Sequence, residues 1–141
     1  MALTKKFMRV SELQKKLDEE GCAPSNYAIE SRGSDAYCLI NDGRQWRVFY
    51  SERGWDADPI FTTASESEAC KFFLDHMRKQ PNWHLIGVFP SELQAKAFER
   101  EIERRGATPI RNDLPESIMG TPQFRVFVAG RDIHLVRDLK Q

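Results

Sequence analysis

The predicted fold of this chain depends most on one stretch, Gln45-Trp46-Arg47-Val48-Phe49-Tyr50-Ser51-Glu52-Arg53-Gly54. From Trp46 to Tyr50 the stretch mixes aromatic and β-branched residues, which suit a pleated and largely buried surface. Because side chains alternate along a strand, Trp46, Val48 and Tyr50 share one face, while Phe49 makes the opposite face partly apolar. The stretch therefore predicts a central strand of a sheet rather than an edge strand.

A polar loop follows this strand and carries a tryptophan between charged residues, Glu52-Arg53-Gly54-Trp55-Asp56-Ala57-Asp58-Pro59. A rigid strand that leads into a charged aromatic loop is a common way to present a binding surface. Trp55 either serves as an apolar anchor with a charged rim for a basic protein partner, or folds back onto the sheet. Both interpretations are open at the level of sequence.

Strand and turn signals place the central strand third among four consecutive strands. The other three are expected at 27–30, 36–40 and 60–63, with turns at 31–35 and at Asn41-Asp42-Gly43. Because short turns join neighbouring strands, we expect an antiparallel β-meander. A helix that covers one face of the sheet is expected at 65–79, where apolar residues recur at helical period. A helix at 11–20, starting with a capping box at Ser11, has a thin apolar face and is expected to pack at the margin.

The segment Gln80-Pro81-Asn82 breaks the second helix, and we expect it to separate two halves, 1–80 and 81–141. The second half is predicted to contain a strand at 83–89, a helix at 91–105 and strands at 108–111, 124–128 and 133–136. The whole chain is therefore predicted to be an α+β protein whose second, smaller α/β half packs with the first into one compact unit.

Two pairs of similar segments suggest an internal repeat. Ser-Glu-Leu-Gln occurs at 11–14 and at 91–94, and Gln-Trp-Arg-Val-Phe-Tyr at 45–50 is echoed by Gln-Phe-Arg-Val-Phe-Val at 123–128. Duplicated halves would explain this order. Chance is the alternative, because capping boxes and strands draw on few residue types.

The charge balance limits the classes of function. Lys plus Arg and Asp plus Glu both number 21, so the formal net charge of the 141 residues is zero. This excludes the overall basic field of a dedicated nucleic-acid binder, although a local patch remains compatible with it. No stretch approaches about 18 consecutive apolar residues, and no apolar run of signal-peptide length follows Lys5 and Lys6. We therefore expect a cytoplasmic protein that does not span a membrane.

Residues suited to catalysis or metal binding are scattered. The cysteines have no CxxC or metal-ligand spacing, and each histidine stands alone in its segment: Cys22, Cys38, Cys70, His76, His84 and His134. No nucleophile elbow, phosphate-binding loop or dinucleotide-binding glycine pattern occurs. The sequence therefore predicts no enzyme activity, no metal site and no cofactor.

The run from Trp46 to Gly54, followed by Ser67-Glu68-Ala69-Cys70-Lys71-Phe72-Phe73, resembles bacterial immunity proteins of contact-dependent growth inhibition and other polymorphic toxin systems. In that family a tryptophan-bearing strand ends in a Tyr-Ser-Glu-Arg-Gly-like turn, and a helix with an acidic start and paired aromatics follows. The similarity covers mainly residues 11–80. It implies a protein without catalytic residues that binds a cognate toxin C-terminal domain and occludes its active site or substrate groove. Many such toxins are nucleases with basic surfaces, which acidic loops would complement.

The partner-binding surface is expected on the loop that contains Glu52, Trp55, Asp56 and Asp58. Turn 31–35 should lie beside this loop and turn 41–44 at the opposite end of the strands. Asp35 is therefore the expected companion, and Asp42 is too far away unless the partner is large. The loop at 112–122, with the acidic residues Asp113 and Glu116, is the next candidate.

A second function remains as an alternative, a single-stranded nucleic-acid-binding module. In it Phe49, Phe127, Arg47 and Arg125 would supply stacking faces and cations on a sheet surface. Balanced charge and the expected helix coverage argue against it. Burial of the two phenylalanines distinguishes the two functions.

Overall fold

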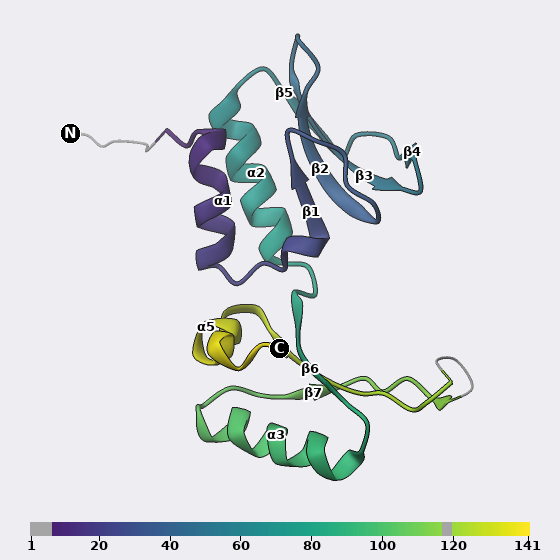
Figure 1. Ribbon diagram of the computed structural model, residues 1–141. Coiled ribbons are helices and arrows are strands. Elements are labelled where there is room, and N and C mark those ends of the chain that lie inside the picture. The colour runs from purple at the N-terminus through teal and green to yellow at the C-terminus, as the bar shows by residue number, and fades with distance from the viewer. Residues whose placement is uncertain (1–6, 117–119) are drawn as a thin grey trace, which may run out of the picture. The chain divides into compact units, whose positions relative to one another are not determined.

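The computed structural model describes residues 7–116 and 120–141 (Figure 1). The chain divides into two compact units, the first ending at Gln80 and the second beginning at Pro81. Each unit has its own sheet and its own cluster of buried apolar residues. Helices and largely antiparallel sheets occur together, so the expected α+β class is confirmed.

In residues 7–80 the first unit contains two α-helices, one short 3-10 helix and five strands. They are α1 (Val10–Glu19), η1 (Pro24–Asn26), β1 (Tyr27–Ile29), β2 (Ala36–Asn41), β3 (Trp46–Glu52), β4 (Trp55–Asp56), β5 (Phe61–Thr63) and α2 (Glu66–Arg78). The sheet runs in the order β1-β2-β3, and β4 and β5 both pair with the free side of β3. β3 is therefore the central strand, as the sequence predicts.

The first strand pair differs from the predicted meander. β1 and β2 are parallel, with Tyr27 opposite Tyr37, whereas β3 is antiparallel to β2, β4 and β5. Residues 30–35 therefore cross back over the sheet, and Glu30 and Asp35 adopt positive φ angles of 61° and 53° there. Parallel strands usually need a connection of roughly a dozen residues or more, so the short turn-rich segment favoured the wrong pairing.

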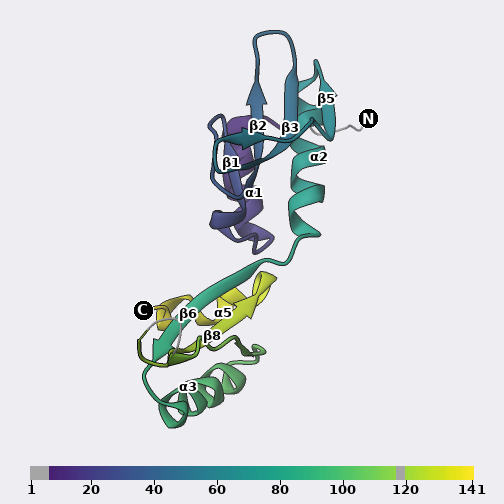
Figure 2. The same cartoon turned by 90° about the vertical axis from the view of Figure 1, so that its right-hand side faces the viewer.

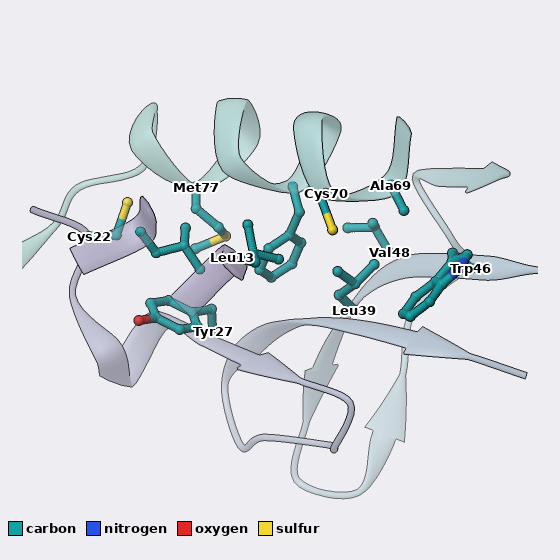
Figure 3. Packing of buried hydrophobic residues seen from close by; sticks show 11 residues of the cluster. Leu13, Cys22, Tyr27, Leu39, Trp46, Val48, Ala69, Cys70 and Met77 are labelled. Atoms are coloured by element: carbon teal, nitrogen blue, oxygen red, sulfur yellow. The ribbon is translucent and has the colours of Figure 1, made fainter. Parts of the chain in front are cut away.

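The two helices lie side by side on one face of the sheet (Figures 1 and 2). In Figure 3 the side chains of Met77, Cys70 and Ala69 point from α2 toward the strands. The buried cluster consists of Leu13, Leu17, Cys22, Tyr27, Leu39, Trp46, Val48, Ala69, Cys70, Phe73 and Met77. Residues from α1, α2 and the strands thus share one apolar core, and the strand stretch 46–48 lies beneath the helices.

The two helices of this unit begin in different ways. Ser65 caps α2 as predicted, because its Oγ accepts a hydrogen bond from the Glu68 amide at 3.1 Å. The predicted cap at Ser11 is wrong, since α1 already begins at Val10. There the Arg9 amide donates to the Glu12 carboxylate at 3.1 Å and the Val10 amide donates to the Glu66 carboxylate at 2.7 Å, so the start of α2 supplies part of the cap of α1. No local sequence pattern predicts the contact between Val10 and Glu66.

The opposite face of this sheet is buried as well. Phe49 is 1% exposed and Cys38 is fully buried beside it. The connection 30–35 covers them: the Gly33 amide donates to Cys38 Sγ at 3.4 Å, and the Arg32 guanidinium lies 5.9 Å from the Phe49 ring centre. A Cβ on Gly33 would lie only 3.0 Å from the Ala36 Cβ, so glycine permits this close approach.

The described residues of the second unit form three strands, one long helix and three short helical segments near the C-terminus. They are β6 (Trp83–Phe89), α3 (Glu92–Arg104), β7 (Ile110–Arg111), β8 (Phe124–Ala129), η2 (Gly130–Asp132), α5 (Ile133–Val136) and η3 (Arg137–Leu139). The antiparallel sheet has the order β6-β8-β7, and Ser91 caps α3 through the Gln94 amide at 3.3 Å. Its core comprises Ile86, Ala95, Ile102, Ala107, Val126, Val128, Ile133 and Val136.

The strand predicted at 133–136 is wrong, because these residues form α5. Ile133 and Val136 are both buried in the core of the second unit. Their spacing of three residues places them on one face of a helical turn. In so short a segment the β-branched composition favoured a strand, and this periodicity was the weaker signal.

The internal repeat is not confirmed. α1 precedes all strands of its unit and packs beside α2, whereas α3 follows β6 and packs against β6 and β8. The two sheets also differ in strand order. Among the described residues, no helix has both the length and the apolar character that crossing a membrane requires.

Candidate partner-binding surface

The predicted loop 52–58 starts as a tight β-hairpin. Glu52 on β3 pairs with Trp55 on β4, so only Arg53 and Gly54 form the turn. Both have positive φ angles, 51° and 79°, which is the backbone of a type I′ hairpin turn. Glycine adopts this conformation freely, whereas it costs Arg53 about 1 kcal/mol. The turn therefore fixes the position of the tryptophan that follows it.

Trp55 projects from the helix-bearing face of the sheet. Cross-strand partners share a face, and Glu52 lies on the same face of β3 as Trp46, Val48 and Tyr50. The Trp55 side chain is 66% exposed. The interpretation in which it folds back onto the sheet is therefore wrong, and the indole is free to contact another molecule. Figure 1 shows the hairpin at the end of the sheet away from α1.

Asp56 lies on the opposite face of the sheet from Trp55, and its carboxylate already has partners within the protein. It pairs with Ser51 across the hairpin, accepts a hydrogen bond from Ser51 Oγ at 2.8 Å and forms a 2.8 Å ion pair with Arg32. The hydrogen bond from Ser51, and then the Arg32 guanidinium, lower the pKa of Asp56. Asp56 therefore ties the hairpin to the connection 30–35 instead of forming a rim beside Trp55. Asp58, two residues on, is exposed.

Two further carboxylates lie near the hairpin and remain accessible. Asp35 and Glu52 are exposed, and neither forms an ion pair with any residue that the structure describes. Burial raises the pKa of the Tyr50 hydroxyl, and the charges of Asp35 and Glu52 raise it further. Ala36 pairs with Ser51 across the sheet, so Asp35 and Glu52, each one residue beyond this pair, lie at the same end of the strands. The expected neighbourhood of Asp35 and the loop is present.

Asp42 lies at the far end of the strands, as the sequence predicts. Asn41 pairs with Trp46 there, while Ala36 pairs with Ser51 at the end that carries the hairpin. Asp42 accepts hydrogen bonds from the Arg44 and Gln45 amides, and these lower its pKa. It therefore stabilises its own turn and takes no part in the surface around Trp55.

A row of aromatic rings continues this surface, and sequence reasoning missed it. We call it the aromatic row: Phe61, Phe72, His76, Tyr37 and Tyr50, with successive ring centres 4.2, 5.8, 4.4 and 5.0 Å apart. Every member is partly exposed. Phe72 and His76 are four residues apart on α2 and so lie on one helical face, which was the available signal.

Tyr50 joins the aromatic row to the hairpin. Its neighbour across the sheet is Ala57, whose amide donates to the Tyr50 carbonyl at 2.8 Å. Trp55 lies diagonally beside Tyr50 on the same face, within the roughly 7–8 Å that long side chains span. We call the surface formed by Asp35, Tyr50, Glu52 and Trp55 the hairpin face. It combines two aromatic side chains with two unpaired carboxylates.

In the second unit, apolar side chains gather on the sheet face that points away from α3. On β6, Trp83, Leu85 and Val88 are 42%, 38% and 37% exposed, and Trp83 contacts Phe127 of β8 with ring centres 5.5 Å apart. The Arg125 guanidinium lies 5.2 Å from the Phe127 ring centre and donates to the Asn112 carbonyl at 2.8 Å. This face, called the open face below, supports the Phe127 and Arg125 part of the nucleic-acid alternative.

The other part of the nucleic-acid alternative is wrong. Phe49 is 1% exposed beneath the connection 30–35, so it offers no stacking face. Arg47 lies 5.3 Å from the same buried ring, and it forms a loose 3.9 Å ion pair with Asp42. The predicted alternation of side chains between the two faces of β3 is confirmed, but the sequence does not show that the connection 30–35 covers the face that carries Phe49.

The second acidic loop is partly engaged in its own structure. Asp113 accepts two hydrogen bonds from Arg111, at 2.9 and 2.8 Å, and Arg111 also binds Glu99 at 2.7 Å. The Arg111 guanidinium lowers the pKa of Asp113. Glu116 is exposed, and residues 117–119 of the predicted loop 112–122 lie outside the described residues.

Burial is the main cause of the pKa shifts of the three cysteines and of His76. Burial raises the pKa of Cys22 and of Cys70 to about 11 and also raises that of Cys38, so these buried thiols stay protonated and unreactive. Burial, and then the charge of Lys79, lower the pKa of His76. No group of three or more potential metal ligands occurs in the described part of the chain.

Comparisons with protein-family models, with curated proteins and with solved structures found no match to this chain.

Proposed function

We propose that this protein is an immunity protein that binds the C-terminal domain of a cognate toxin, a nuclease, and occludes its active site or substrate groove. The observation that carries the proposal is the hairpin face, where a 66% exposed Trp55 stands beside the unpaired carboxylate of Glu52. Tryptophan is the residue type most enriched among the hot spots of protein interfaces, and an acidic rim suits a basic partner.

The local structure favours binding because it holds this anchor in place before a partner arrives. The two-residue turn, the Ser51–Asp56 hydrogen bond and the Arg32–Asp56 ion pair fix the hairpin on the sheet. A side chain on a preorganised backbone loses less conformational entropy on binding than one on a mobile loop. The sequence resemblance to immunity proteins covers this same stretch and adds the identity of the partner to the proposal.

The test is neutralisation of toxicity in cells. The first observation needed is whether the neighbouring upstream reading frame encodes a large secreted protein with a variable C-terminus. If it does, that C-terminal domain is expressed as the toxin with or without this chain. We expect rescue of growth by the unmodified protein. Trp55→Ala should weaken binding of the purified toxin domain by about 2 kcal/mol or more, roughly thirtyfold in Kd.

Trp83→Ala is the matched control, since it removes a second exposed tryptophan from the other unit. It should leave rescue and Kd unchanged. Failure of the unmodified protein to rescue would refute the proposed function. Equal effects of the two substitutions, with both variants folded, would move the interface away from the hairpin face.

A second candidate function is single-stranded nucleic-acid binding on the open face. The contact between the Trp83 and Phe127 rings, with Arg125 beside them, is the observation that favours it. Base stacking on aromatic side chains contributes about 1–3 kcal/mol per base. Arg125 is the one charged residue among the strand positions of this face, so binding should be weak and its salt dependence shallow. A fluorescence titration with oligo-dT should show Trp83→Ala weakening binding while Trp55→Ala does not.

A further inference from the structure

The hairpin face pairs each accessible aromatic ring with an accessible negative charge. Glu52 lies directly across the strand pair from Trp55, and Asp35 precedes Ala36, which pairs with Ser51 next to Glu52. Directly opposed side chains in a sheet have their Cβ atoms about 4.5–5.5 Å apart. A single side chain of a partner can therefore contact the Trp55 ring and the Glu52 carboxylate at the same time.

Nothing in the described structure neutralises these two carboxylates. Asp56, by contrast, is engaged by Arg32. Arg53, at the tip of the hairpin, forms no ion pair with Asp35 or Glu52 among the described residues. The hairpin face thus carries an excess of negative charge that a cationic group on a partner complements.

The aromatic rings and carboxylates of the hairpin face favour a guanidinium group over an ammonium group. A guanidinium group is planar, weakly hydrated and able to stack on an aromatic ring while its edge donates hydrogen bonds to carboxylates. An ammonium group is a strongly hydrated point charge, so it loses more solvation when it approaches an indole. A purely apolar side chain would cover Trp55 but would leave Glu52 desolvated without a partner.

We infer that the hairpin face is a recognition site for an arginine side chain of the bound protein, whose guanidinium stacks on Trp55 or Tyr50 and pairs with Glu52 and Asp35. This inference rests on the proposed function for the nature of the partner, since it specifies which side chain of the toxin domain the surface receives. The stacking ring and the two carboxylates come from this chain alone.

The test uses a small probe, so that it does not depend on the toxin. The full chain, labelled with ¹⁵N, is titrated with Nα-acetylarginine amide while the indole N–H signals of its three tryptophans are followed. Trp46 is buried and Trp83 lies in the other unit, so these two signals serve as internal references. We expect the Trp55 signal to shift in a saturable way and the other two to stay in place.

Three comparisons decide the chemistry. The citrulline analogue has the same shape without the charge, and it should bind roughly fivefold more weakly, as should the lysine analogue. Glu52→Gln should weaken binding of the arginine probe by a similar factor, while Asp42→Asn, at the other end of the strands, should not. Equal binding of the arginine and citrulline probes, an unaffected Glu52→Gln variant, or equal shifts of the Trp55 and Trp83 signals would each overturn the arginine site.

Failure of this inference is distinguishable from failure of the proposed function. If the arginine probe does not bind but Trp55→Ala still abolishes neutralisation of the toxin, the arginine site is wrong and the proposed function stands. If the probe binds with the expected selectivity while the unmodified chain does not protect cells, the arginine site stands and its partner is a different protein.

Discussion

Replacing Gly33 with alanine tests the connection that makes β1 and β2 parallel. An added Cβ would lie 3.0 Å from the Ala36 Cβ and 3.2 Å from the Ala28 Cβ, tighter than ordinary van der Waals contact. Both neighbours are methyl groups fixed to strands, so neither can rotate away. The φ angle of Gly33 lies outside the positive range that disfavours alanine, so any loss of stability comes from the contacts.

The size of the effect follows from two opposing terms. Overpacking a close contact costs about 1–3 kcal/mol, while replacing glycine stabilises by about 0.4–1 kcal/mol through the unfolded chain. We therefore expect the free energy of unfolding of the first unit to fall by about 1 kcal/mol. For a unit of this size that corresponds to a decrease in Tm of roughly 4–8 °C.

The assay is urea unfolding of the full chain, followed through the indole signal of Trp46, which is buried in the first unit. Gly33→Ala should lower the urea midpoint. In a background that already contains Ala36→Gly, the same substitution should cost less, because the closer of the two contacts is gone. If the protein followed the antiparallel hairpin predicted from the sequence, Gly33 would lie in an open turn. Unchanged or increased stability of Gly33→Ala would therefore refute the crossing connection.

Three further predictions follow from hydrogen bonds and burial. Folding lowers the pKa of Asp56, so the stability that this carboxylate contributes is present above its ordinary pKa of 3.8 and is lost as the pH falls below that value. Asp56→Asn should lower the urea midpoint at pH 7 and flatten the decline of the midpoint between pH 5 and 2. An unchanged pH profile would contradict the role of Arg32 and Ser51. Ser91→Ala should destabilise the second unit by about 1 kcal/mol through loss of the α3 cap, while Ser11→Ala should leave the Tm of the first unit unchanged. Equal effects of the two substitutions in thermal unfolding would contradict the assigned helix starts. The three buried cysteines should react with a thiol reagent only after unfolding, and rapid labelling of the native protein would contradict their burial.

The parts of the fold that follow from local signals could be predicted from the sequence. Ser65 and Ser91 each precede a helix-period apolar pattern, and both cap their helices in the structure. The parts that failed depend on distant residues. Part of the cap of α1 comes from Glu66, 56 residues beyond Val10, and the parallel pairing of β1 requires a glycine to pass close over a strand at Ala36. Neither interaction leaves a periodic or turn-like pattern.

The candidate site shows the same division. Trp55 and Glu52 follow directly from the strand and its charged continuation, and Asp35 follows from which turns share an end of the sheet. The sequence prediction misplaces Asp56 because it takes residues 52–58 as one loop, in which neighbouring side chains have no fixed sides. Two of them form a strand instead, so Trp55 and Asp56 face opposite ways. The aromatic row required knowledge of how α2 crosses the sheet.

The division of the outer strand into β4 and β5 has a consequence for how a partner can attach. The strand beside β3 is interrupted at residues 57–60, and Pro59 within the interruption has no amide hydrogen to donate. An invading strand from another molecule therefore finds no continuous ladder of backbone donors and acceptors along this edge. Under the proposed function, recognition along this edge would then depend on side chains. Exchange of a few hairpin residues would change which partner is bound without disturbing the backbone that supports them.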